Sequence, residues 1–168
     1  MIRSFNGKTP RIAETAFISE AAYIVGGVEI GEHSNVWPGA VLRGDFAAIR
    51  IGKYVDIEDN STLHAGTDME ISDNVIVGHG AVVHSSRVGS RVLIGINATT
   101  LHNSEIGDNC IIAAGSVVTE GMVIPPDSFV FGVPAKVKGQ VTDKHKGWMD
   151  GHENFYPNLA AQYKREGL

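Results

Sequence analysis

Aliphatic side chains recur at every sixth position along most of the chain. The row is interrupted by a three-residue slip after position 42, a two-residue slip after position 63 and one missing residue before position 88. Its members are Ile12, Ile18, Ile24, Ile30, Val36, Leu42, Ile51, Ile57, Leu63, Ile71, Val77, Val83, Val88, Ile94, Thr100, Ile106, Ile112, Val118, Ile124 and Val130. Nineteen of these twenty positions are Ile, Leu or Val, so the spacing is a structural repeat and not a chance pattern.

The positions around this row repeat as well. The third residue after an aliphatic position is often Gly or Asn, which accept a left-handed backbone. These residues are Gly27, Asn60, Asn74, Gly80, Asn97, Asn109, Gly115 and Gly121. The fourth residue is commonly small, as at Ser34, Ala40, Ser61, Ala81, Ala98, Cys110 and Ser116. A six-residue unit of short strand plus tight corner predicts a mainly β fold: a triangular prism with three units per coil, whose coils stack as parallel strands about 4.8 Å apart. Cys110 is expected inside this prism as a core side chain.

The chain length predicts a single domain. The extent of the repeat divides this domain into three parts. Residues 1–11 form an N-terminal cap segment, residues 12–136 form the solenoid, and residues 137–168 form a C-terminal extension. Phe155, Tyr156, Leu159 and Tyr163 are spaced for one face of an α-helix, with Pro157 near its first turn. We expect this helix to cover exposed strand edges or to pack on a neighbouring copy.

Composition excludes several classes of function. The formal net charge is -5 and no basic cluster is present, which argues against nucleic acid as a partner. No apolar run approaches the roughly 20 residues that cross a bilayer, and the N-terminus has no apolar segment typical of a signal peptide, so no membrane partner is expected. With a single cysteine, the sequence fits a cytoplasmic protein.

Two histidines occupy equivalent positions on successive coils. His64 follows Leu63, and His84 follows Val83 one full coil later, so both should point outward from one side of the prism, about 4.8 Å apart. His79 belongs to the preceding side and is separated from them by a corner. A metal ion requires all its ligand nitrogens within a few ångströms of one point. We therefore expect His79 of one subunit to face His64 and His84 of the next, which closes as a homotrimer with sites between subunits. Three His ligands with one position left for water are typical of catalytic zinc. The alternative is that these histidines are ordinary interface residues.

The repeat resembles the left-handed β-helix of the hexapeptide-repeat family, and longer motifs resemble its gamma class of carbonic anhydrases, in their shorter bacterial form. The matching stretches are S-N-V-W-P-G-A-V-L-R-G-D (34–45), I-R-I-G (49–52), D-I-E-D-N-S-T-L-H (56–64) and V-G-H-G-A-V-V-H (77–84). The resemblance implies a trimer in which His64, His79 and His84 are the metal ligands, and a metal-bound hydroxide that hydrates carbon dioxide reversibly to bicarbonate. Imidazole ligands suit Zn²⁺ and also Fe²⁺ or Co²⁺, so the native metal is open.

The resemblance also implies roles for neighbouring residues. Arg43 and Asp45 match an interface pair near the metal, and Asp59 belongs to the same network. Glu58 stands where the family has Gln, and it is a candidate base or simply an added negative charge. Glu58 and Asp59 are therefore the candidate catalytic residues.

The sequence departs from the family in its proton-transfer residues. The acidic loop of the archetypal enzymes is reduced to A-G-T-D-M-E (65–70), and Phe46 replaces a glutamate. Asp68, Glu70 and His102 are candidate proton relays, against the simpler interpretation that they are surface residues.

Two other functions fit this sequence. The fold also serves acyltransferases, which share the G-V-P-A-K motif at 132–136, and coenzyme A thioesterases. The reduced acidic loop is equally compatible with a trimeric metal-binding protein of weak catalytic activity.

Overall fold

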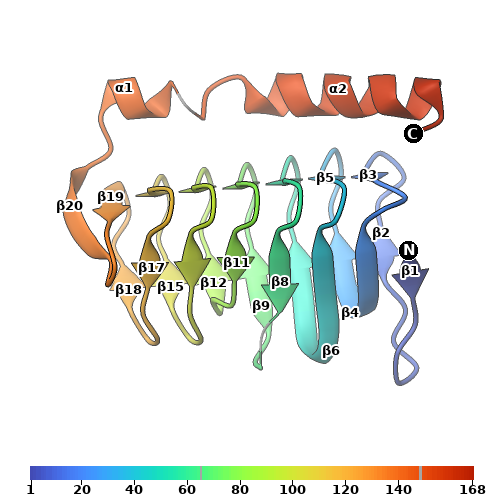
Figure 1. Ribbon diagram of the computed structural model, residues 1–168, viewed down its shortest axis with the longest axis horizontal. Coiled ribbons are helices and arrows are strands. Elements are labelled where there is room, and N and C mark those ends of the chain that lie inside the picture. The colour runs from blue at the N-terminus through green and yellow to red at the C-terminus, as the bar shows by residue number, and fades with distance from the viewer. Residues whose placement is uncertain (65, 148) are drawn as a thin grey trace.

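The computed structural model describes residues 1–64, 66–147 and 149–168. In this part of the chain, short strands wind into a parallel solenoid with three faces, and two helices follow it (Figure 1). The predicted mainly β class with a C-terminal helix is confirmed.

The strands stack on three faces. What we call the helix-side face contains β3 (Phe17–Ile18), β5 (Asn35–Val36), β7 (Asp56–Ile57), β10 (Ile76–Val77), β13 (Leu93–Ile94), β16 (Ile111–Ile112) and β19 (Ser128–Phe131). The histidine face contains β8 (Thr62–His64), β11 (Val82–Val83), β14 (Thr99–Thr100) and β17 (Val117–Val118). The third face contains β9 (Met69–Ile71), β12 (Arg87–Val88), β15 (Glu105–Ile106) and β18 (Val123–Ile124). Two long strands, β4 (Tyr23–Ile30) and β6 (Val41–Ile51), connect two of these faces and pair with each other.

β6 pairs with both β8 and β9, so it bridges the histidine face and the third face. β1 (Ile2–Arg3) and β2 (Arg11–Ile12) pair with β4.

The aliphatic row forms the core in the predicted register. Val83 pairs with Leu63 on one side and Thr100 on the other, and all three are fully buried. Cys110 is also fully buried, as predicted. Of the eight predicted left-handed corners, seven have positive φ. Gly27 does not, because the left-handed residue in that coil is Gly26.

The C-terminal extension differs in detail from the prediction. β20 (Lys136–Gln140) pairs antiparallel with β19 and so covers the last strand edge, the role expected of the helix. After α1 (Asp143–Lys146), α2 (His152–Glu166) runs back along the helix-side face towards the first coils (Figure 1). Pro157 is its sixth residue, not part of its first turn. No helix in the described ranges is long and apolar enough to span a bilayer.

The helix packs on the solenoid through aromatic residues. Tyr163 contacts Phe17 and Trp37 edge-on, with ring centroids 5.9 and 5.2 Å apart, and Tyr156 lies 6.2 Å from Trp37. α2 lies over β3 and β5. Its side chains also reach the corner that follows β10 on the same face, where they line a cavity together with His79.

Candidate metal centre

A column of three imidazoles lies on the histidine face. His64 ends β8 and His84 follows β11, and their ring centroids are 5.3 Å apart. His102 continues the column one coil further, again with a 5.3 Å separation from His84. The outward pair inferred from the spacing is thus present in the structure, because parallel pairing of β8 and β11 stacks equivalent positions.

The environment of His84 favours neutral imidazole. Burial lowers the pKa of His84, and the neighbouring charges of His64 and His102 lower it further. Its Nδ1 atom is buried and has no hydrogen-bond partner, and the same holds for Nδ1 of His102. Neutral imidazole is the form that binds a metal ion.

The predicted pair of Arg43 and Asp45 lies beside His64 in the same chain. Asp45 Oδ1 is 3.1 Å from His64 Nε2, and Asp45 Oδ2 accepts from Arg43 Nη1 at 2.5 Å. Burial by itself raises the pKa of Asp45, but the hydrogen bonds from Arg43 and from the Phe46 N–H outweigh it and lower the pKa. Asp45 therefore stays ionised and can orient the His64 ring.

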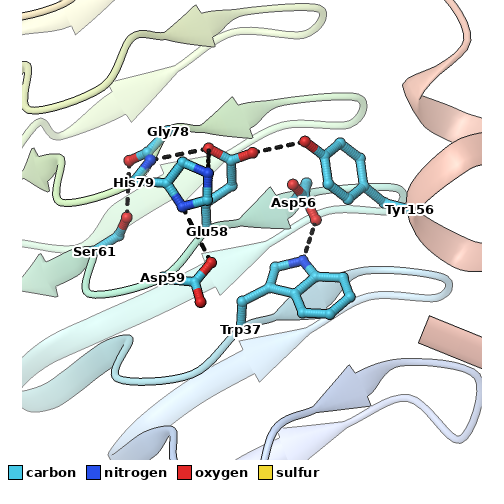
Figure 2. Close-up of polar contacts among 8 residues, drawn as sticks. All are labelled: Trp37, Asp56, Glu58, Asp59, Ser61, Gly78, His79 and Tyr156. Carbon is cyan, nitrogen blue, oxygen red and sulfur yellow. Dashed lines mark hydrogen bonds and ion pairs between the residues drawn. The ribbon is translucent and has the colours of Figure 1, made fainter. Parts of the chain in front are cut away.

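His79 occupies a separate position, in the corner after β10. About half of its side chain is exposed (52%), and its ring lies between two carboxylates (Figure 2). Nδ1 is 3.1 Å from Asp59 Oδ2, and Nε2 is 3.3 Å from Glu58 Oε2. Glu58 and Asp59 thus lie at His79 and not at the column of the other histidines.

Glu58 links His79 to the C-terminal helix. Its Oε2 accepts the backbone N–H of His79 at 2.9 Å, and its Oε1 accepts the Tyr156 hydroxyl at 2.6 Å (Figure 2). Burial, and then the hydrogen bond to Glu58, raise the pKa of Tyr156, so the hydroxyl remains a donor. A carboxylate suits this position because both of its oxygens face a donor.

A buried carboxyl group lies beneath the same helix. Asp56 is fully buried; its Oδ1 accepts from Trp37 Nε1 at 2.6 Å, while Oδ2 has no partner. Burial raises the pKa of Asp56 to about 8; the Trp37 hydrogen bond opposes this, and the charges of Glu58 and Asp59 add to it.

One chain by itself brings together only two of the three predicted metal ligands. His64 and His84 are adjacent, and His84 presents an unpartnered buried nitrogen atom. Among the described residues of a single chain, however, no three His, Cys, Asp or Glu side chains converge on one point. The third imidazole must therefore come from another copy if the three are to share an ion.

The three candidate proton relays are placed differently. His102 packs against His84, whereas Asp68 accepts from Arg50 at 2.9 Å and from the Ala48 N–H at 3.0 Å. Glu70 is exposed on β9, on the third face. Within the described residues neither carboxylate forms a hydrogen bond or ion pair with a histidine of the column. Ala65, the first residue of the shortened loop, lies outside the described residues.

A cavity of about 170 Å³ lies between α2 and the corner that carries His79, lined by Glu58, Asp59 and Tyr156 among others. A larger hollow of about 820 Å³ lies beside Phe46, but none of the three predicted ligands lines it. Its arginines, Arg11 and Arg50, are already paired with carboxylates. We therefore place the candidate chemistry at the histidines and not in the larger hollow.

Sequence reasoning missed Tyr156 and Asp56. Tyr156 was assigned only to a capping helix, and its partner Glu58 is 98 positions away, with no repeat to link the two. Asp56 directly precedes the core residue Ile57, and it is buried because the helix-side face is covered, which the sequence does not show.

Comparison with known proteins supports the assignment of the repeat. A family described as bacterial transferase hexapeptide (six repeats) matches residues 85–120. A protein of Geobacillus kaustophilus named carbonic anhydrase is 40% identical over 98% of this chain and 91% of its own length. Gamma carbonic anhydrase 2, mitochondrial, of Arabidopsis thaliana is 34% identical over 95% of this chain, which spans 60% of that relative. A Bacillus cereus crystal structure, provisionally described as an acetyltransferase, has a TM-score of 0.92 and 36% identity over 98% of this chain and 96% of its own.

Proposed function

Because the chain belongs to the gamma carbonic anhydrase family of hexapeptide-repeat proteins, we propose that it is a metal-dependent carbonic anhydrase that hydrates carbon dioxide reversibly to bicarbonate. The ligands would be His64 and His84 of one subunit and His79 of the next in a homotrimer, with Zn²⁺, Fe²⁺ or Co²⁺ as the ion. A cytoplasmic location stays a prediction.

One observation carries this proposal: two imidazoles point outward from adjacent coils, and a third lies around a corner, held between two carboxylates. When bound, the cation supplies a nucleophile at neutral pH, because coordination by three histidines brings the pKa of water to about 7. An isolated chain holds two of the three ligands at one place, so assembly is part of the function.

The remaining residues orient these ligands. Asp45, ionised and bonded to Arg43, holds His64 at Nε2. Asp59 orients the His79 ring through Nδ1, and Glu58 Oε2 holds the His79 backbone N–H. His79 Nε2, which lies 3.3 Å from the same Glu58 oxygen, is the nitrogen that would turn from Glu58 to the metal. Both oxygens of Glu58 already accept hydrogen bonds, which favours a positioning role for Glu58 over that of a base. Of the three candidate relays, His102 is the one that packs against a proposed ligand, so it is the residue we propose for proton transfer.

The test is elemental analysis of purified protein followed by carbon dioxide hydration assays with Zn²⁺, and with Fe²⁺ loaded without oxygen. We expect about one metal ion per chain in a trimer, because each subunit interface completes one site. Hydration should be lost in His64→Ala, His79→Ala and His84→Ala. Full metal binding by any of these variants would contradict the proposed ligand set.

The similarity to a structure described as an acetyltransferase makes acyl transfer the second candidate. An acetyl-coenzyme A assay run beside the hydration assay separates the two functions, because acyl transfer should survive removal of the metal by a chelator. Metal near one per chain without hydration under either condition would instead favour the weakly catalytic metal-binding protein.

A further inference from the structure

The row of aliphatic residues is interrupted at one place, directly behind the histidine column. Thr100 is the one position of the twenty that is not aliphatic, and it is fully buried together with Ser85 and Ser104. Ser85 Oγ lies 2.8 Å from both Thr100 Oγ1 and Ser104 Oγ, and Ser104 Oγ donates to the Leu101 carbonyl at 2.6 Å. These three residues form what we call the hydroxyl cluster.

Stability alone does not account for the hydroxyl cluster. A buried hydroxyl without a partner costs roughly 1–3 kcal/mol, whereas a satisfied hydrogen bond contributes only about 1 kcal/mol net. Replacing all three hydroxyls together with apolar groups of similar shape would leave this part of the core as stable or more stable. A local exception to an otherwise uniform core pattern is expected where function requires it.

The position of the cluster indicates its role. Ser85 directly follows His84, in a corner of three residues (84–86) between β11 and β12, while the next corner between β14 and β15 has four (101–104). In the shorter corner Ser85 points into the core and the preceding His84 packs against His64 and His102 in the outer column. Fixing Ser85 inside the prism therefore fixes the direction in which His84 leaves it.

The same cluster holds the corner that carries His102. The Ser104 hydroxyl donates to the carbonyl of Leu101, the residue before His102, and this hydrogen bond closes the corner that contains His102. Ser85 joins the two corners, so the separation of His84 and His102 depends on it as well as on the backbone hydrogen bonds from His84 to Thr100 and from Ser86 to Ser104.

We propose that Ser85, Thr100 and Ser104 are positioning residues that set the direction of the His84 imidazole for metal binding. This proposal rests on the proposed function only in taking His84 as a ligand. The hydroxyls do not touch the metal or the substrate; they act through the backbone of the corner that carries His84.

The test compares the all-apolar triple variant Ser85→Ala, Thr100→Val, Ser104→Ala with the native chain. In competition with a chelator, its affinity for Zn²⁺ and Co²⁺ should fall about 10- to 100-fold, the effect typical of removing groups that orient a ligand. Its metal-free form should unfold at the same or a higher temperature. Thr100→Ser, which keeps the hydroxyl, should bind metal as the native chain does.

Ser116→Ala is the matched control, because Ser116 is also a buried core hydroxyl, one coil beyond Thr100, but it bonds to the Gly132 N–H and lies outside the hydroxyl cluster. It should leave metal affinity unchanged. Native affinity in the triple variant would overturn the proposal, and so would an equal loss in Ser116→Ala.

A second measurement separates this proposal from the proposed function. In metal-free protein, NMR of the His84 ring should show one ordered state in the native chain and averaged signals in the triple variant. If the native chain binds no metal the proposed function fails, but the ring signals still decide the role of the cluster. Identical His84 signals in the two proteins would refute it.

Discussion

At the scale of single residues, the most unusual ionisable group is Asp56. It has no solvent exposure, and one of its two oxygens lacks a donor, so an ionised carboxylate there would be poorly stabilised. Burial raises the pKa of Asp56 to about 8, so near neutral pH the group is mostly a neutral acid. The neutral form of Asp56 is part of the packing of α2 on the solenoid, because Trp37, which donates a hydrogen bond to Asp56, also packs against Tyr156 of α2.

Asp56→Asn should therefore remove a pH dependence of stability. Between about pH 4 and about pH 8 the folded chain keeps a proton that the unfolded chain has released, so native stability falls as pH rises through that window. The slope is at most about 1.4 kcal/mol per pH unit. Asparagine mimics the neutral acid, so the two proteins should be closest in stability near pH 4, and the variant should become progressively more stable than the native chain up to about pH 8.

Chemical unfolding of both proteins across this range checks the prediction. Glu120→Gln is the control, because it makes the same carboxyl-to-amide change in an exposed side chain that forms no hydrogen bond or ion pair with the described residues. A stability difference that does not change with pH would show that Asp56 keeps its ordinary ionisation.

Residue positions that the repeat governs could be predicted, and the others could not. The pairing of Val83 with Leu63 follows from counting coils, and it places His64 against His84. The pairing of Asp45 with His64 within one chain, and the hydroxyl cluster behind His84, depend on side-chain directions at irregular corners. The slips and the missing residue marked those corners in the sequence without defining their geometry.

At the scale of secondary structure, α2 does more than cover the solenoid. Its apolar residues pack on Phe17 and Trp37, and its Tyr156 hydroxyl reaches the carboxylate that holds His79. Only the amphipathic spacing of this helix was visible in the sequence. The face of the prism that it covers could not be predicted, because the connection from β20 through α1 has no periodicity.

Tyr156→Phe should loosen His79 while keeping the ring packing of α2. The lost hydrogen bond to buried Glu58 should lower the free energy of unfolding by about 1–3 kcal/mol, because the bond is to a charged group. Metal affinity should fall with it, because Glu58 Oε2 also holds the His79 backbone. Tyr163→Phe is the control: that ring packs in the same cluster, but its hydroxyl makes no hydrogen bond to the part of the chain that the structure describes.

Denaturant unfolding and chelator competition on both variants check this role. If Tyr156→Phe and Tyr163→Phe lose the same stability and neither changes metal affinity, α2 serves only as a cover for the aromatic cluster.

At the scale of the whole molecule, the described residues of one chain leave His79 apart from the other two histidines. The solenoid cannot bend to bring them together, since each coil is bonded to its neighbours along three faces. A cyclic assembly joins one corner of each prism to the histidine face of the next and completes every site by the same contact. Trimer formation and metal binding are therefore expected to be linked.

Hybrid trimers provide the decisive test of this shared site. His79→Ala and His84→Ala should each be inactive alone, since every site in either homotrimer lacks one ligand. When the two are refolded together, random mixing should complete about one quarter of the sites, those in which His79 comes from one variant and the His64 and His84 pair from the other. Metal content per chain and hydration activity should recover in that proportion.

The matched control mixes His64→Ala with His84→Ala. Both substitutions remove a ligand that the same subunit supplies to the site, so no subunit in any hybrid has both His64 and His84, and no activity should recover. Equal recovery in the two mixtures, or none in verified hybrids of the first, would show that the ligands are not shared between subunits.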